Sequence, residues 1–324
     1  MAMNKLETFI VNTPLAKYIR SKSKQIILPG FEGVPLYDVA IFFVHQMNKV
    51  GLNDRAAAIS FNFLMAIPAA TIFLCTLIPY MPISREITIE LLDLFKMIAP
   101  DEKTYGLVAT FLNDFLNTPR SGLLSVGFLL AVFYASNAVM GIMRSFNRSL
   151  HQHKERGFFG DRWTAIKLTT MLIVILMATI TLLVTQGTLF GYLMRIMDIT
   201  NVFVRQLIHS VRWVIIILLI LFSIGYIYKY APAITKRWKL ASPGAIFATF
   251  LVVLSTFAFS FWVNKFGTYN KVYGSIGTIL ILMFLLYINS LILLIGYELN
   301  VCIHSLKALA GQRHEDRSPE HVRL

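Results

Sequence analysis

Six long apolar segments separated by short basic loops constrain this chain more than any other feature of its sequence. An apolar run of about 20 residues is long enough for a helix to cross the hydrocarbon core of a bilayer. Only 15% of the 324 residues are charged, against about 25% in soluble domains. The sequence therefore predicts an all-α integral membrane protein with six transmembrane helices. They are expected at about residues 56–80, 122–143, 165–190, 210–230, 244–264 and 275–303.

The remaining chain is divided by its composition. A basic arm over residues 1–35 precedes the membrane domain, which is predicted to cover residues 36–304. The connections between the spans are too short for a further soluble domain of ordinary size. Residues 305–324 are polar and lack apolar periodicity, so a disordered tail is expected there. The first 35 residues lack an apolar core followed by a small-residue cleavage site, so we expect no cleaved signal peptide.

The distribution of Lys and Arg predicts the orientation of the spans. If the six spans alternate, 21 of the 30 Lys and Arg residues lie on one side of the membrane. Because basic loops mark the cytoplasmic side, both termini are predicted to be cytoplasmic. This bias and the attraction to anionic headgroups account for the net charge of +13. Membrane lipids are the expected partners, and nucleic acid is not, since no module that reads it is visible.

Two regions beside the spans are predicted to form amphipathic helices. Val39, Phe42 and Phe43 recur near helical spacing within residues 36–50. This segment is too short and too polar to span the bilayer, so we expect it to lie in the membrane interface. The first outer loop, 81–121, contains two further amphipathic stretches. These either cap the outer mouth of the bundle or rest on the headgroups.

Polar residues inside the apolar segments are the candidates for a functional site, because an unsatisfied polar group is costly in lipid. Asn62 lies six residues before Pro68, whose missing N–H predicts a kink or an opening in the first span. A broken helix can line a substrate path; the alternative is a kink held by neighbouring helices. The candidates for a substrate path or for coupling are Asn62, Pro68, Asn137, Asn289 and Glu298.

Glu298 is the one acidic residue inside a predicted span. Ionisable residues inside membranes are functional candidates by default, because their burial is costly. Glu298 lies near the cytoplasmic end of the last span, so it can instead pair with an arginine of the inner loops and fix helix packing. A role in ion coupling and a role in packing both stay open.

Small and basic residues near the ends of the spans predict packing and anchoring. Close backbone approach is expected at Gly274, Gly277 and Gly296, and a homo-oligomer through small-residue faces stays open. The expected anchors to inner headgroups are Arg144, Arg148, Lys236 and Arg237.

Several motifs of known chemistry are missing from the chain. It contains no phosphate loop, no HExxH, no GxSxG and no cysteine cluster. His151 and His153 form an isolated pair without a third ligand in view, so no metal site is predicted. No cofactor and no catalytic residue are predicted either.

Four stretches of sequence carry a resemblance to a known family. They are DRAAAISFNFLMAIPAA, GLLSVGFLLAVFYASNAVMGIMRSFNRSL, YKYAPAITKRWKLASPGAIFATF and YNKVYGSIGTILILMFLLYINSLILLIGYELN. In this order they resemble the YihY/BrkB family of bacterial inner-membrane proteins, over about residues 38–303. The YGS-x-G start and the G-x-E-L-N end of the last stretch are its most specific parts. Met65 and Leu285 depart from the family, which often has serine and tryptophan there, so a hydroxyl-dependent role for the first span is not expected.

The resemblance implies a six-spanning protein of the inner membrane. One branch of the family that this chain resembles is linked to serum resistance, and another to lipid or lipopolysaccharide export. Some members of the family carry the label ribonuclease BN. Because no acidic or histidine cluster could hold catalytic metals, we interpret that label as a misassignment. We therefore favour a transporter or flippase for a lipid-linked or amphiphilic envelope solute. A non-transporting envelope scaffold and a membrane-embedded enzyme are the alternatives.

Overall fold

The chain folds entirely into helices and loops within the residues that the structure describes. This computed structural model describes residues 26, 30–31, 33–49, 51–80, 118–150, 156–184, 202–234, 237–265 and 269–315, with nine isolated positions between 89 and 114. Six of its helices are long and apolar enough to cross a membrane. They are α4 (Leu52–Leu77), α7 (Ser121–Ser149), α8 (Phe158–Val184), α10 (Val202–Tyr230), α11 (Pro243–Lys265) and α12 (Tyr269–Glu315). The predicted all-α membrane fold with six spans is confirmed.

A shorter amphipathic helix, α3 (Leu36–Lys49), precedes the first span, as the sequence predicted. Gly51 separates it from α4 with a φ of +60°, a left-handed conformation that glycine adopts without steric cost. The buried Val39 of α3 packs with Ile303 of α12 in a small second core. The position of α3 in a membrane interface stays a prediction. The two amphipathic stretches predicted within 81–121 fall almost entirely outside the described residues.

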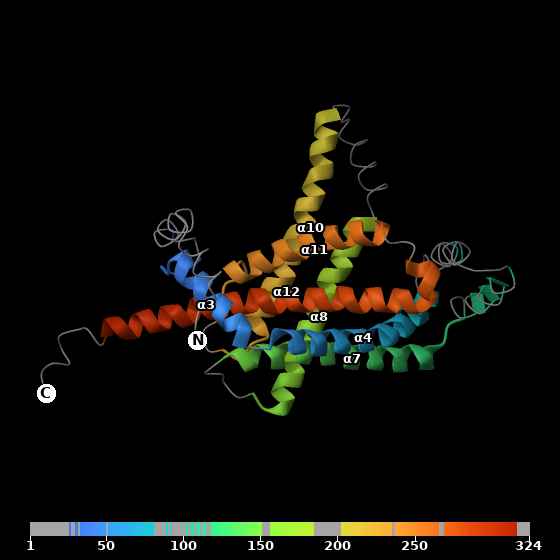
Figure 1. Cartoon of the computed structure of the whole chain (residues 1–324). Helices are drawn as coiled ribbons and strands as arrows, with labels where there is room; N and C mark the ends of the chain where they lie inside the picture. Colours follow the sequence, from blue (N-terminus) through green and yellow to red (C-terminus); the bar gives the residue numbers. More distant parts are fainter. Residues whose placement is uncertain are drawn as a thin grey trace, which may run out of the picture.

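Three helices form the centre of the bundle. α4 packs along α7, and α12 packs along α4, so the three run side by side in Figure 1. α8 and α10 are steeply inclined to these helices in the same view, and α11 packs against α12. The main core lies where the helices converge, and it contains Ile59, Phe146, Leu168, Tyr228 and Leu294.

The first span continues without interruption through its proline. α4 is a single helix from Leu52 to Leu77, with Pro68 inside it and exposed at its surface. The opening that the sequence suggested at this point is therefore absent. A 3-10 turn at Ile78–Tyr80 follows the end of α4.

The last helix is longer than the sequence predicted. α12 contains 47 residues, about 70 Å at 1.5 Å per residue, whereas a bilayer core is about 30 Å thick. Figure 1 shows its C-terminal part extending beyond the bundle. The prediction of a disordered tail from residue 305 is therefore wrong as far as Glu315, where the chain is helical. Good helix formers such as Leu306 and Ala308 extend a helix that is already established. Residues 316–324 lie outside the described part of the chain.

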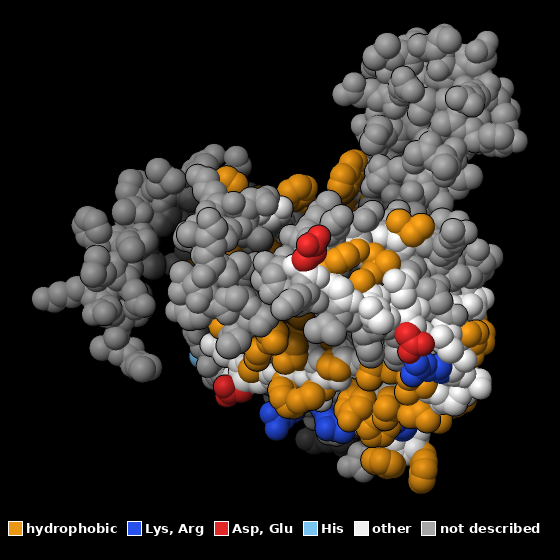
Figure 2. Space-filling model, turned by 90° about the vertical axis from the view of Figure 1, so that its right-hand side faces the viewer, with side chains coloured by type: hydrophobic (Ala, Val, Ile, Leu, Met, Phe, Trp, Pro, Cys, Tyr) orange, Lys and Arg blue, Asp and Glu red, His pale blue; other side chains and the backbone are white. Residues whose placement is uncertain are grey.

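The described surface is strongly apolar. Side chains such as Leu129, Phe250 and Phe257 are more than 60% exposed. Figure 2 shows apolar side chains over a broad part of one face, with few charged groups between them. Large exposed apolar areas are unfavourable in water but are the normal outer surface of a membrane bundle.

Candidate functional site

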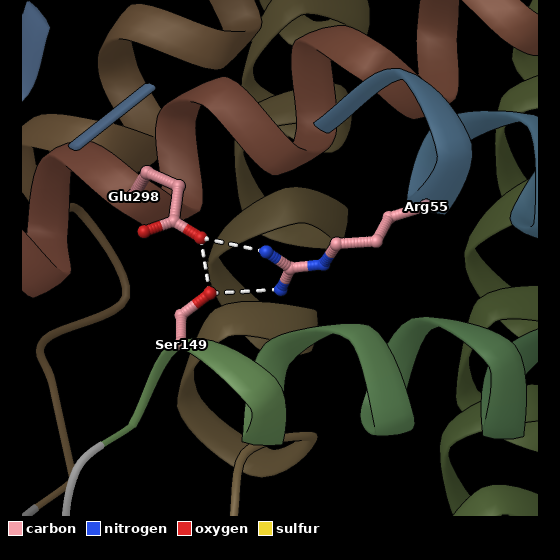
Figure 3. Close-up of polar contacts among 3 residues, drawn as sticks. All are labelled: Arg55, Ser149 and Glu298. Atoms are coloured by element: carbon pink, nitrogen blue, oxygen red, sulfur yellow. Dashed lines mark hydrogen bonds and ion pairs between the residues drawn. The ribbon is translucent and has the colours of Figure 1, made fainter. Parts of the chain in front are cut away.

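A buried cluster of charged and polar side chains joins the three central helices at one end. Arg55 lies in the first turn of α4, Ser149 is the last residue of α7, and Glu298 lies on α12. Figure 3 shows the three side chains pointing toward one another from these helices. We call the surrounding region the polar end of the bundle: the first turn of α4, the last turn of α7, residues 231–234 and 237–242, and residues 296–304 of α12.

The cluster is closed by three hydrogen bonds. The Nη1 atom of Arg55 donates to Oε1 of Glu298 at 3.2 Å, which is also an ion pair. The Nη2 atom of Arg55 donates to the Ser149 hydroxyl at 2.8 Å. That hydroxyl donates in turn to Oε1 of Glu298. Arg55 is 3% exposed and Glu298 is fully buried, so protein shields the pair from both water and lipid.

Some polar atoms of the cluster lack a hydrogen bond to the described residues. These are Nε of Arg55, Oε2 of Glu298 and the hydroxyl of the neighbouring Tyr297. The Gln46 side chain of α3 lies close enough to the Glu298 carboxylate to interact with it. Because an unpaired buried polar atom costs about 1–3 kcal/mol, the cluster holds more polarity than the packing of the helices requires.

Aromatic rings form the wall beside the cluster. Tyr297 stacks on Phe146 of α7, with ring centroids 3.8 Å apart and planes 3° apart. Tyr228 of α10 meets both rings at an angle, and its hydroxyl donates to the Leu293 carbonyl at 2.7 Å. Trp238 also packs against Tyr297, with the two ring centroids 5.3 Å apart. These rings exclude water from the charged pair and tie α10 to it.

Further polar contacts hold the segment that follows α10. The Asn147 side chain accepts a hydrogen bond from the Ala233 backbone N–H at 3.0 Å. Arg156 donates to the carbonyl oxygens of Ala231 and Pro232, at 3.2 and 2.9 Å. Backbone groups that leave a helix need such partners when they are buried. The segment is thereby folded back against α7.

The predicted site residues are only partly brought together. Asn62 donates to the Ala58 carbonyl and Asn289 to the Leu285 carbonyl, each within its own helix. At 1.5 Å per residue, Asn62 lies about 10 Å along α4 from Arg55. Pro68 faces outward. Of the five candidates for a substrate path, only Glu298 belongs to the cluster.

Asn137 has a partner that the sequence did not suggest. Its side-chain oxygen accepts a hydrogen bond from Arg162, in the first turns of α8. The Arg162 guanidinium also lies over the Phe133 ring, 4.5 Å from the centroid, and contacts the Met140 sulfur at 3.2 Å. This second arginine joins α7 to α8 at a half-buried position.

The predicted packing and anchoring residues are placed as follows. Gly296 lies at the closest approach of α12 to α11, where a Cβ built on it would be 2.6 Å from the Gly244 carbonyl oxygen. The side-chain surroundings of Gly274 and Gly277 are outside the described part of the structure, as is Lys236. Arg144, Arg148 and Arg237 are exposed.

Sequence reasoning missed Arg55 and Ser149. Arg55 is one of the 21 basic residues assigned to the cytoplasmic side by their distribution, and Ser149 directly follows Arg148, a predicted headgroup anchor. No local pattern separates an arginine that turns inward from one that anchors headgroups. The clue available was chemical: Glu298 is an acid inside a span and needs a cationic partner.

The described residues contain no group of three or more His, Cys, Asp or Glu side chains placed to hold a metal ion. His151 and His153 are not among these residues. The arrangement therefore offers charge pairing and hydrogen bonding.

Comparison with known proteins identifies the family. The family model described as virulence factor BrkB matches residues 43–321. YfkH of Bacillus subtilis (strain 168), whose name describes it as ribonuclease-like, is 29% identical over 268 residues, 83% of this chain and 94% of the relative. A UPF0761 membrane protein of Haemophilus influenzae is 22% identical over 273 residues, 82% and 95% of the two chains. Another, of Idiomarina loihiensis, is 28% identical over 212 residues, 64% and 69% of the two chains.

No solved structure matches the chain. The match of the family model extends from α3 to beyond the described end of α12, and so includes all six spans and every residue of the cluster. The chain therefore belongs to the BrkB family of multi-pass membrane proteins.

Proposed function

We propose that this protein is a transporter or flippase for a lipid-linked or amphiphilic solute of the bacterial envelope. The observation that carries the proposal is the buried Arg55–Ser149–Glu298 cluster between three spans. Stability alone is a poor reason for such a cluster. Replacing a buried ion pair by apolar residues of similar size is often neutral or stabilising. Ionisable groups retained inside membrane bundles mark ion or substrate paths.

The carboxylate of Glu298 can act as a switch, because it can bind either Arg55 or an incoming proton or cation. Its Oε1 atom binds Arg55 and Ser149, while Oε2 makes no hydrogen bond to the described residues. A proton or a cationic group bound at Glu298 would weaken the attraction to Arg55. This exchange would loosen the contact between α4 and α12 and thereby couple an ion to a movement of the helices.

A groove on the outside of the bundle offers room for an apolar chain. It lies between α11 and α12, has a volume of about 670 Å³ and is lined mainly by apolar side chains, among them Phe259, Trp262 and Phe284. Among the described residues that line it, Ser255 alone carries a hydroxyl group. The acyl or polyprenyl chain of a lipid fits a surface of this chemistry. The headgroup of the same lipid would cross the membrane past more polar parts of the helices.

The orientation is part of the proposal. The polar end, with its basic residues, faces the cytoplasm, and the two termini lie on that side. The basic bias of the loops supports this orientation. A fluorescent protein fused after residue 324 should fold and fluoresce in the cytoplasm. A periplasmic reporter enzyme that is active at the same position would reverse the orientation.

The transport proposal can be tested in vesicles of phosphatidylethanolamine and phosphatidylglycerol. The full chain is reconstituted with trace fluorescent phosphatidylglycerol or fluorescent polyprenyl phosphate, and a membrane-impermeant reductant then bleaches the outer leaflet. We expect the protein to change the accessible fraction of one probe when a pH gradient is imposed. If each probe is bleached at the same rate and to the same extent in vesicles with and without the protein, the result would count against transport of this class of solute.

A matched pair of variants separates coupling from packing. Glu298→Gln removes the charge of the carboxylate, and the double variant Arg55→Gln/Glu298→Gln removes both charges while keeping size and hydrogen bonding. If the cluster couples ions, the double variant should fold and lose the response to the gradient. If the cluster only fixes the helices, as in a non-transporting scaffold, the double variant should behave like the native protein in every transport assay.

A further inference from the structure

A second polar feature lies apart from the ion pair, at the outer rim of the polar end. It is a pocket of about 200 Å³ between the segment that precedes α11 and the part of α12 that follows Glu298. Arg237, Lys239 and His304 line it, and no acidic side chain is found among its described lining residues. All three basic side chains are exposed, so they are accessible from outside the bundle.

The floor of the pocket is formed by two buried polar side chains. Asn300 accepts the Gly244 backbone N–H at 2.8 Å through its oxygen and donates from Nδ2 to the Ser242 hydroxyl oxygen at 2.9 Å. The same hydroxyl oxygen accepts the Ala245 backbone N–H at 3.4 Å. Ser242 and Asn300 are each only 5% exposed, and both line the pocket.

This network leaves two hydrogen-bond donors without acceptors. The Ser242 oxygen already accepts two hydrogen bonds, so its own O–H must donate elsewhere, and the Asn300 amide has a second N–H. The described residues provide no acceptor for either proton. A buried donor without an acceptor costs free energy, so an acceptor supplied by a ligand would be favoured here.

The electrostatics of the pocket select an anion. Arg237 is positioned by the Tyr230 ring, with the guanidinium carbon 5.0 Å from the ring centroid. The N-terminus of the 23-residue α11 forms part of the wall and adds the positive end of its dipole. Its first backbone N–H groups are already bound by Ser242 and Asn300, so side chains would hold the anion.

We propose that this pocket binds a phosphate group, either on an anionic phospholipid or on a soluble phosphate compound. A phosphate combines several acceptor oxygens with negative charge, which matches two free donors and three basic side chains. A volume of about 200 Å³ admits such a group together with ordered water, since a cavity needs only about 10–15 Å³ to hold one water. The site does not depend on the transport function proposed above.

The test uses the full chain in detergent and in lipid nanodiscs. Native mass spectrometry counts bound phosphatidylglycerol, with phosphatidylcholine as the zwitterionic comparison lipid. Inorganic phosphate is titrated separately and followed by the shift in melting temperature, with chloride at equal ionic strength as the comparison. The pocket variant is Arg237→Gln/Lys239→Gln, and His304→Asn is a second, independent change. The control is Arg144→Gln/Lys167→Gln, which removes the same charges from exposed positions outside the pocket.

We expect the affinity for one of the two probes to fall at least 10-fold in the pocket variant and less than 2-fold in the control. Loss of phosphatidylglycerol binding alone identifies a lipid headgroup site, and loss of the phosphate-induced shift alone identifies a soluble ligand. Equal losses in pocket and control variants would show general charge attraction and overturn the proposal, as would the absence of binding by the native chain. An unchanged melting temperature without ligand shows that the variants are folded.

Discussion

The two ends of the α11–α12 pair are built in opposite ways. At the polar end the backbones touch: a Cβ placed on Gly244 would lie 2.0 Å from the Gly296 carbonyl oxygen, and Asn300 binds the first turn of α11. Toward the other end the same helices leave a groove of about 670 Å³ lined by apolar side chains. One helix pair is thus locked by directional contacts at one end and loosely packed at the other.

This difference indicates where the bundle can change shape. Directional hydrogen bonds and backbone contacts permit only one relative position of the two helices. An apolar side chain, in contrast, has nearly the same energy against lipid as against a neighbouring helix. Helix association in a membrane has little hydrophobic drive, so close packing and polar contacts decide it. We therefore expect the contact between α11 and α12 at the polar end to stay fixed, and the groove end of the same helix pair to adapt to what binds there.

The largest effect on stability is expected at the buried ion pair. Glu298→Ala leaves the Arg55 charge buried without a counter-ion and should lower the free energy of unfolding by about 3–5 kcal/mol. The double variant Arg55→Met/Glu298→Met should recover most of that loss, because both charges are removed. Unfolding in mixed detergent, followed by tryptophan fluorescence, measures both. A double variant as unstable as the single one would mean that the ion pair itself stabilises the polar end.

A smaller loss is expected where the backbones touch. Gly296→Ala places a methyl group 2.5 Å from the Tyr228 hydroxyl and 2.7 Å from the Ala248 Cβ, so the two helices must separate. Such overpacking typically costs about 1–3 kcal/mol. Gly122→Ala in α7 is the control, since its new methyl group would meet no atom within 4 Å. If both substitutions change stability alike, the contact between α11 and α12 is not closely fitted.

The sequence predicted the groove end of the molecule better than the polar end. Apolar length alone located all six spans and the amphipathic α3, because these features depend on local composition. The same criterion underestimated the length of α12, because a polar segment such as 305–315 stays helical when an established helix precedes it.

The polar end depends on contacts between residues far apart in the chain. Arg55 and Glu298 are 243 positions apart, and Ser149 is 94 positions from Arg55. Glu298 was recognisable because an acid in a span is rare, whereas Arg55 shares its surroundings in the sequence with ordinary headgroup anchors. Asn62 and Asn289 were singled out by the same rule but bond within their own helices, an outcome that composition cannot distinguish.

Two asparagines of α12 provide a further comparison of polar contacts. Asn300→Ala removes the partners of the Gly244 N–H and of Ser242 and should cost about 1 kcal/mol, the typical effect of losing a helix cap. Asn289→Ala removes only a bond to the Leu285 carbonyl of the same helix and should change stability by less than about 0.5 kcal/mol. Equal losses in the same unfolding assay would argue against a special role of Asn300 in fixing α11.

The smallest effect on stability is expected in the groove, where function should respond instead. Ala258 is exposed and lines the groove, so Ala258→Phe fills it without disturbing the core. The free energy of unfolding should change by less than about 0.5 kcal/mol, as for other surface substitutions. Ala178→Phe, the same change on an exposed face of α8, is the control. If an amphiphile uses the groove, Ala258→Phe should slow movement of the fluorescent lipid probe in vesicles while Ala178→Phe does not. Equal rates for the two variants would exclude the groove from the path and leave the polar end as the remaining candidate for a site of transport.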